Sequence, residues 1–138
     1  MASHLILLED SNILMLRRFN TGYEDGNYSV IAGHVSSDES FTQAIVREAK
    51  EEANIEIEYI NLQVLHVMHR RKVDEVRIDV FIKANKWKNE PTNMEPNKCD
   101  DLRWFPIQNP PKNVVPYIKF AIECINRNEF YSEFGWCL

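Results

Sequence analysis

The stretch "GHVSSDESFTQAIVREAKEEANI", Gly33 to Ile55, carries the strongest pattern in this sequence. Apolar residues recur at helical spacing from Phe41, and Ser40 and Gln43 stand at capping-box spacing, so a helix is predicted to begin there. At about 100° per residue, Glu48 and Glu52 fall on the same face as Phe41, which is the face that should be apolar. Ionised carboxylates rarely occupy a packed face without a partner.

The conflict on this face has two readings. Glu48, Glu51 and Glu52 could simply be solvated where the last turn of the helix leaves the core, because acidic clusters are common on exposed helices. Held together on a half-buried face, however, the three carboxylates would repel one another and bind protons unless a cation were present. A hard divalent cation such as Mg²⁺ prefers carboxylate and water oxygens and would remove the conflict.

The spacing upstream favours the metal reading. Gly33 is followed after five residues by Glu39, and seven residues later the run Arg47-Glu48-Ala49-Lys50-Glu51-Glu52 begins. This pattern resembles the Nudix box, the loop-helix-loop signature of Nudix hydrolases, and it meets every charged position of that signature. One position departs, because Asn54 stands where the signature has glycine. Asparagine is the next best residue for the left-handed conformation that ends a helix, so the departure should leave the chemistry intact.

The resemblance implies a fold and a set of roles. The fold is the Nudix-type α/β/α sandwich, an α/β protein with a mixed β-sheet between helices. Glu48, Glu51, Glu52 and the Ala32 carbonyl are expected to hold divalent metal, Mg²⁺ or Mn²⁺. Arg47 and Glu39 are expected to fix the loop at Gly33 against the helix. Two candidates for the catalytic base stay open, Glu48 and Asp101, the latter in "KCDDLRWFPI".

The reaction implied is hydrolysis of a phosphoanhydride in a nucleoside diphosphate linked to a group X. The segment before and into the last predicted helix resembles small Nudix enzymes that convert nucleoside triphosphates, including oxidised ones, to monophosphate and pyrophosphate. Tyr117 is the candidate for stacking on a base, and Arg70, in "HRRK", is the candidate for a phosphate contact or else part of a solvated hairpin end. The alternatives are another diphosphate, such as ADP-ribose or a dinucleotide, and an inactive nucleotide-binding scaffold.

The whole chain sets the remaining expectations. Its 138 residues are enough for one domain, 1–138, with its own core. Neither a secretory signal nor a membrane span is visible, and three cysteines without paired spacing predict reduced thiols in a cytoplasmic protein. A net charge of −5 argues against a nucleic acid polymer as partner. The expected partner is a small nucleotide, and the aromatic tail "FYSEFGW" either closes a pocket or forms a homodimer interface.

Alternation and turn residues predict the other elements. Strands are expected at 4–9, 13–19, 27–33 and 102–107, and two longer β-rich segments at 55–71 and 75–87. Residues 88–100 should form a loop, and 115–128 a second amphipathic helix. His66 and His69 are three apart in a strand, so they face opposite sides and form no metal pair.

Overall fold

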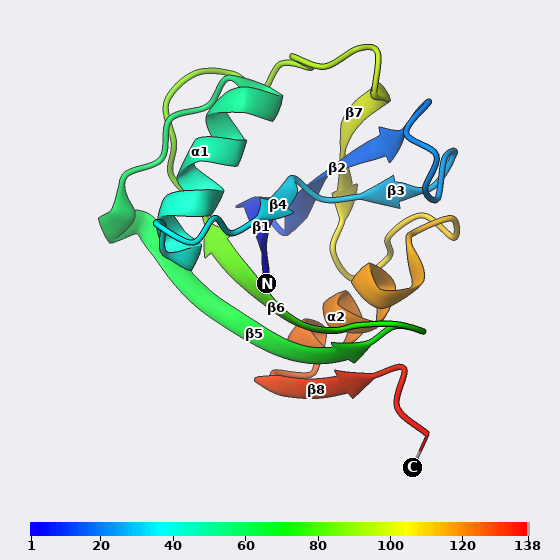
Figure 1. Ribbon diagram of the computed structural model, residues 1–138. Coiled ribbons are helices and arrows are strands. Elements are labelled where there is room, and N and C mark those ends of the chain that lie inside the picture. The colour runs from blue at the N-terminus through cyan, green and yellow to red at the C-terminus, as the bar shows by residue number, and fades with distance from the viewer. Residues whose placement is uncertain (138) are drawn as a thin grey trace.

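The computed structural model describes residues 1–137 and contains two helices, eight strands and one short 3₁₀ turn (Figure 1). In chain order the elements are β1 (Ala2–Glu9), β2 (Asn12–Arg18), β3 (Tyr28–Ser29), β4 (Ala32–His34), α1 (Phe41–Ala53), the 3₁₀ turn (Tyr59–Asn61), β5 (Leu62–Arg71), β6 (Val76–Ala84), β7 (Cys99–Pro106), α2 (Pro116–Asn126) and β8 (Tyr131–Phe134).

The strands form a mixed sheet in the order β3-β2-β1-β6-β5-β8, with β4 beside β1 and β7 beside β2. The pairs β1–β6 and β5–β8 are parallel, and the others are antiparallel. β1 is central to the sheet because it pairs with three strands. Its residues 2–7 pair with β6, residues 2–4 also pair with β4, and Leu8 and Glu9 pair with β2.

The two helices cover opposite faces of the central strands (Figure 1). Side chains alternate along a strand, so Leu5 and Leu7 of β1 pack on the side of α1, whereas Ile6 packs on the side of α2. β6 does the same, with Val80 and Ile82 on one side and Phe81 on the other. The resulting three layers confirm the predicted α/β/α sandwich.

Helix α1 follows its sequence pattern closely. Ser40 caps the amino end and forms a reciprocal capping box with Gln43, an arrangement that contributes about 1 kcal/mol. The helix ends at Asn54, whose φ of 56° and ψ of 32° are left-handed, as expected for a residue that replaces glycine. The buried positions face the core through Ala44, Ile45, Ala49 and Ala53.

Two segments differ from the expectation. The predicted strand 27–33 is two strands, because β3 pairs with β2 and β4 pairs with β1, and the chain crosses between them at Val30 and Ile31. Residues 55–61 are a bridge and a 3₁₀ turn instead of the start of a strand.

The aromatic tail takes a definite place in the fold. It adds β8 to the edge of the sheet beside β5, and the indole N–H of Trp136 donates to the carbonyl of His69 at 2.9 Å. The ring of Trp136 also lies against that of His69, with 4.6 Å between the ring centroids. Hydropathy gives no candidate for crossing a membrane among the helices of residues 1–137.

Candidate active site

An ion-pair network ties the loop before α1 to the middle of the helix. Arg47 donates to both carboxylate oxygens of Glu39, at 2.8 and 3.2 Å, and to the His34 carbonyl at 3.3 Å. Glu39 also accepts from the Ser36 N–H. Because the Arg47 and Ser36 bonds favour the charged form, they lower the pKa of Glu39 to about 2. Arg47 and Glu39 thus make the supporting contact that the sequence predicts.

Gly33 and Glu48 are in direct contact across the loop and the helix. A side chain at position 33 would overlap the carboxyl group of Glu48, so Glu48 keeps its place only while this position is glycine. Arg47 holds that carboxylate from the other side with a hydrogen bond of 2.8 Å. The Glu48 side chain is only 15% exposed, so both contacts fix its position on the half-buried face of α1.

Glu52 lies one turn further along the same face. Burial raises the pKa of Glu52 well above its usual value, and the neighbouring carboxylates of Glu48 and Glu95 raise it further. The Ala32 N–H donates to Glu52 at 3.3 Å and offsets part of this effect. Glu48 and Glu52 thus share one face of α1, as the helical periodicity predicts, and this face lies beside the Ala32 backbone.

Glu51 stands apart from this pair. Its side chain is 54% exposed and its nearest cation is Arg47, at 3.4 Å. Among residues 1–137, no three His, Cys, Asp or Glu side chains converge into a ready-made ligand set.

Glu95 is a site residue that sequence reasoning missed. It belongs to the loop 85–98, and the backbone of that loop is tied to the end of α1 because the Met94 N–H donates to the Glu52 carbonyl at 3.2 Å. The Glu95 N–H donates to the side-chain oxygen of Asn93 at 3.0 Å, which forms an Asx turn. The loop carries two glutamates, Glu90 and Glu95, and no periodicity in its sequence distinguishes one from the other.

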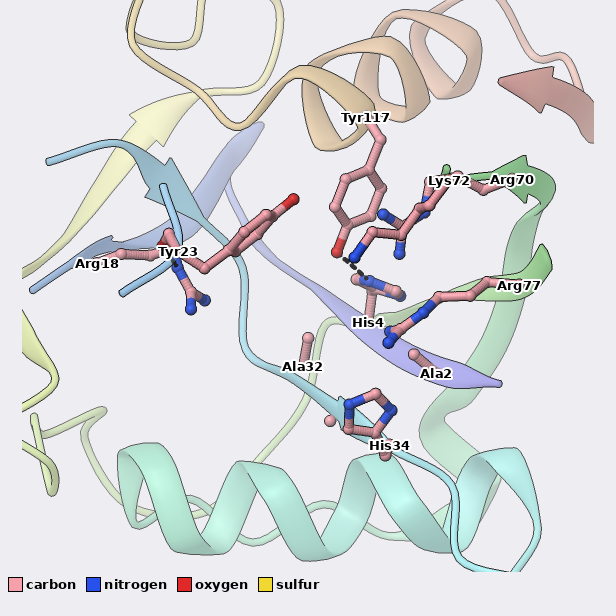
Figure 2. A pocket seen from close by; sticks show the side chains of 11 residues that line it. Ala2, His4, Arg18, Tyr23, Ala32, His34, Arg70, Lys72, Arg77 and Tyr117 are labelled. Carbon is pink, nitrogen blue, oxygen red and sulfur yellow. Dashed lines mark hydrogen bonds between the residues drawn. The ribbon is translucent and has the colours of Figure 1, made fainter. Parts of the chain in front are cut away.

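A cavity of about 410 Å³ opens beside the loop (Figure 2). Its walls come from β1, β4, the loop after β2, the β5–β6 hairpin and the start of α2. The lining residues are Ala2, His4, Arg18, Tyr23, Ala32, Gly33, His34, Arg70, Lys72, Arg77 and Tyr117. Ala32 and Gly33 therefore join the carboxylate pair of α1 to this cavity.

Arg70 and Tyr117 both line the cavity, but their side chains are engaged with each other and with buried partners. Arg70 is 5% exposed and donates to Asp79 at 2.6 Å, so it is not part of a solvated hairpin end. Its guanidinium lies over the ring of Tyr117, 3.6 Å from the centroid, and covers one face of that ring. Only the other face of Tyr117 can meet a substrate.

His4 completes the floor of the cavity. Its Nε2 lies 3.0 Å from the Tyr117 hydroxyl, and its ring stacks on Phe81 with centroids 4.5 Å apart. Burial lowers the pKa of His4 to about 4, and the Asp79 carboxylate offsets this only in part. His4 is therefore neutral at physiological pH.

Asp101 is placed in β7, beyond β2, and does not line the cavity. Its carboxylate accepts from the Tyr28 hydroxyl and from Arg103. Burial would raise the pKa of Asp101, but these two hydrogen bonds and the charge of Arg103 outweigh it and hold that pKa below its usual value. The carboxylate of Asp101 is thus engaged by partners of its own, Tyr28 and Arg103.

The donor set fits a divalent cation. Glu52 and Glu48 are half-buried and close, and only Glu48 has a guanidinium partner. The raised pKa of Glu52 means that its charged form lacks compensation, which a cation would supply. All the available ligand atoms are oxygens, the kind that Mg²⁺ and Mn²⁺ prefer.

Comparison with known proteins agrees with this geometry. The sequence model of the NUDIX domain matches residues 1–122. The fold is similar to the MutT NUDIX hydrolase of Burkholderia pseudomallei, with 24% identity, a TM-score of 0.80, and coverage of 88% of this chain and 94% of that one. It is also similar to the MutT protein of Methanosarcina mazei Go1, with 17% identity, a TM-score of 0.76, and 91% of each chain covered.

These findings confirm the predicted family and the predicted enzyme class, whose members act on small molecules. The chain belongs to the Nudix family and is a Nudix pyrophosphohydrolase.

Proposed function

We propose that this chain hydrolyses the phosphoanhydride of a nucleoside diphosphate linked to X, with a nucleoside triphosphate, standard or oxidised, as its principal substrate. The products would be a monophosphate and pyrophosphate. The observation that carries this proposal is the half-buried pair Glu48 and Glu52, which opens through Ala32 and Gly33 onto a cavity lined by cations. Carboxylates at one side and cations at the other suit a metal-bound polyphosphate.

Mg²⁺, or Mn²⁺ in its place, would be held by Glu48, Glu51, Glu52 and the Ala32 carbonyl. For Glu51 this requires its exposed side chain to leave Arg47, which the weak 3.4 Å contact permits. When bound, the cation supplies neutralisation of the negative charge that grows on the phosphoanhydride oxygens during the reaction.

The surrounding residues keep this face in position. Gly33 leaves room for the Glu48 carboxylate, and Arg47 holds the same group from the opposite side. Arg47 is anchored in turn by its two bonds to Glu39, which tie the loop to the helix. We regard Arg47 and Glu39 as positioning residues because they bind each other, and Arg47 also binds the His34 carbonyl and the Glu48 carboxylate.

We assign proton acceptance from the attacking water to Glu48, and Glu95 is the second candidate because its charge reaches Glu52. Asp101 is the third, and its contacts with Tyr28 and Arg103 make it the weakest. The variants Glu48→Gln, Glu95→Gln and Asp101→Asn separate these roles. The base variant should lose the rise of kcat with pH, whereas Asp101→Asn should keep the wild-type pH profile.

The substrate proposal is tested by product analysis. Purified protein with Mg²⁺ is offered nucleoside triphosphates, oxidised triphosphates, ADP-ribose and dinucleotide polyphosphates, and pyrophosphate is measured separately from phosphate. Pyrophosphate from triphosphates supports the proposal. Turnover of ADP-ribose or dinucleotides alone would replace it with the diphosphate-conjugate reading. If no compound is hydrolysed with either Mg²⁺ or Mn²⁺, an inactive nucleotide-binding scaffold is favoured.

The wider setting is proposed on the same basis. We propose one domain over residues 1–138. A cytoplasmic location is proposed because two of the three cysteines are buried free thiols. A nucleic acid polymer is not proposed as partner because the net charge is −5. A homodimer through the edge strand β8 is tested by light scattering of the wild type, where a monomer at all concentrations would exclude it.

A further inference from the structure

The cavity concentrates positive charge in a protein that is acidic overall. Four of its lining residues are basic, namely Arg18, Arg70, Lys72 and Arg77, and none is acidic. The whole chain nevertheless carries a formal charge of −5. Such a local reversal of sign creates a field that attracts anions into a concave site.

The carboxylates near these cations do not neutralise all of them. Asp79 is fully used by Arg70, in a buried pair at 2.6 Å. Glu75 is shared by Arg77, at 3.0 Å, and Lys72, at 3.5 Å. No carboxylate of residues 1–137 pairs with Arg18, which donates instead to the Tyr23 carbonyl and the Thr21 hydroxyl. The charge of Arg18 also helps to lower the pKa of Asp25, so four cations stand near three carboxylates.

The unbalanced cations stand on two walls that face each other (Figure 2). Arg18 and Tyr23 enter from the end of β2 and the loop that follows it, while Lys72 and Arg77 enter from the β5–β6 hairpin. Helix α1 runs along the bottom of the view, below His34, whereas Lys72 is labelled near the top (Figure 2). Glu52 of this helix accepts from the Ala32 N–H, and Glu48 lies against Gly33, so both carboxylates are at the α1 side of the cavity. The site thus has an acidic end and a basic end.

The loop that carries Tyr23 is held in place. Asp25 accepts from the N–H and hydroxyl of Thr21 and from the Gly22 N–H, which closes the turn. The Tyr23 ring lies 5.1 Å from the Arg18 guanidinium and 5.5 Å from the Lys72 ammonium, so it connects the two basic walls. An anion entering here would meet cations whose positions are already fixed.

We propose that Arg18, Lys72 and Arg77 form a subsite for an anionic group that the substrate carries in addition to the diphosphate that is cleaved. This proposal rests on the proposed function, because it takes the cleaved diphosphate to lie at the acidic end. The group is a phosphate or carboxylate, either the terminal phosphate of a nucleoside triphosphate or an acidic substituent on X. Arg70 is not part of the subsite, since Asp79 occupies its guanidinium.

The subsite is tested first without any turnover. Inorganic pyrophosphate is titrated into the protein in EDTA, where the α1 carboxylates have no metal and repel the ligand, so only the basic end can bind it. Arg77→Gln should raise the dissociation constant about tenfold, which is the loss of affinity expected for one charge-assisted contact. Lys112→Gln removes the same charge outside this cavity and should leave binding unchanged. Absence of binding, or equal loss in both variants, would overturn the subsite.

Hydrolysis of matched substrates then identifies the source of the anion. ATP is compared with ADP, and UDP-glucuronate with UDP-glucose, so that each pair differs in one anionic group. A preference for ATP that Arg77→Gln removes assigns the terminal phosphate, and a preference for the uronate assigns an acidic X. Equal kcat/KM within both pairs overturns the proposal. If no compound is hydrolysed, the proposed function fails, and the pyrophosphate titration alone decides on the subsite.

Discussion

Replacing Gly33 with alanine should destabilise the protein through one neighbour, the side chain of Glu48. The backbone of Gly33 is not left-handed, so alanine is not strained by its own conformation. Its methyl group would instead overlap the Glu48 carboxyl, which must leave its place and give up the 2.8 Å hydrogen bond to Arg47. Overpacking and a lost hydrogen bond to a half-buried carboxylate together cost about 1–3 kcal/mol.

A double-mutant cycle isolates this contact. In a Glu48→Ala background the overlap is absent, so Gly33→Ala should cost nothing, and it could add about 0.4–1 kcal/mol by restricting the unfolded chain. The two substitutions should therefore couple by at least about 1 kcal/mol. Urea unfolding at constant m-value measures each free energy of unfolding.

Gly22→Ala provides the matched control. Its φ is +82° and no atom lies within 4 Å of its added methyl group, so its cost comes from backbone strain alone. That cost should be the same with and without Glu48. If Gly33→Ala is equally destabilising in both backgrounds, the assignment of Gly33 to the support of Glu48 is wrong.

Three further substitutions test other parts of the account. The pKa of Glu39 is about 2 in the folded protein, so its contribution to the free energy of unfolding is present above pH 4.5 and is lost as the pH falls towards 2. Glu39→Gln should therefore flatten the acid limb of the stability–pH curve, measured by urea unfolding at each pH. Asn54→Ala should lower the free energy of unfolding by about 1 kcal/mol because alanine resists the left-handed conformation, whereas Asn54→Gly should be nearly neutral; equal losses would contradict this. Asp79→Ala should cost about 3–5 kcal/mol because it leaves the Arg70 guanidinium buried without a partner, and a thermal midpoint close to that of the wild type would refute this.

The elements that sequence reasoning predicted well are those fixed by local rules. Helix α1 could be derived from its capping box and its 3.6-residue period, and these also placed Glu48 and Glu52 on the half-buried face. Asn54 could be assigned because few residues other than glycine tolerate a left-handed φ. These features depend only on residues within a turn or two of one another.

The features that were missed depend on pairing between distant segments. For Arg70 the sequence left a phosphate contact and a solvated hairpin end open, because nothing near it in the chain showed that the register of the β5–β6 hairpin brings Asp79 to its guanidinium. The parallel pairing of β8 with β5 and the approach of Glu95 to Glu52 are likewise set by tertiary packing. The same limit explains why Arg18 and Arg77, far apart in sequence, were not foreseen as neighbours of one cavity.

The most direct test of the central claim is the Mg²⁺ dependence of pyrophosphate release by the wild type and by Glu52→Gln. The account predicts metal-dependent release by the wild type and a loss of several orders of magnitude in Glu52→Gln. In the metal-free protein the raised pKa of Glu52 means that its ionisation opposes folding, so the variant should be at least as stable as the wild type at neutral pH. Collapse of stability in Glu52→Gln, or full activity without this carboxylate, would contradict the claim that α1 binds the metal.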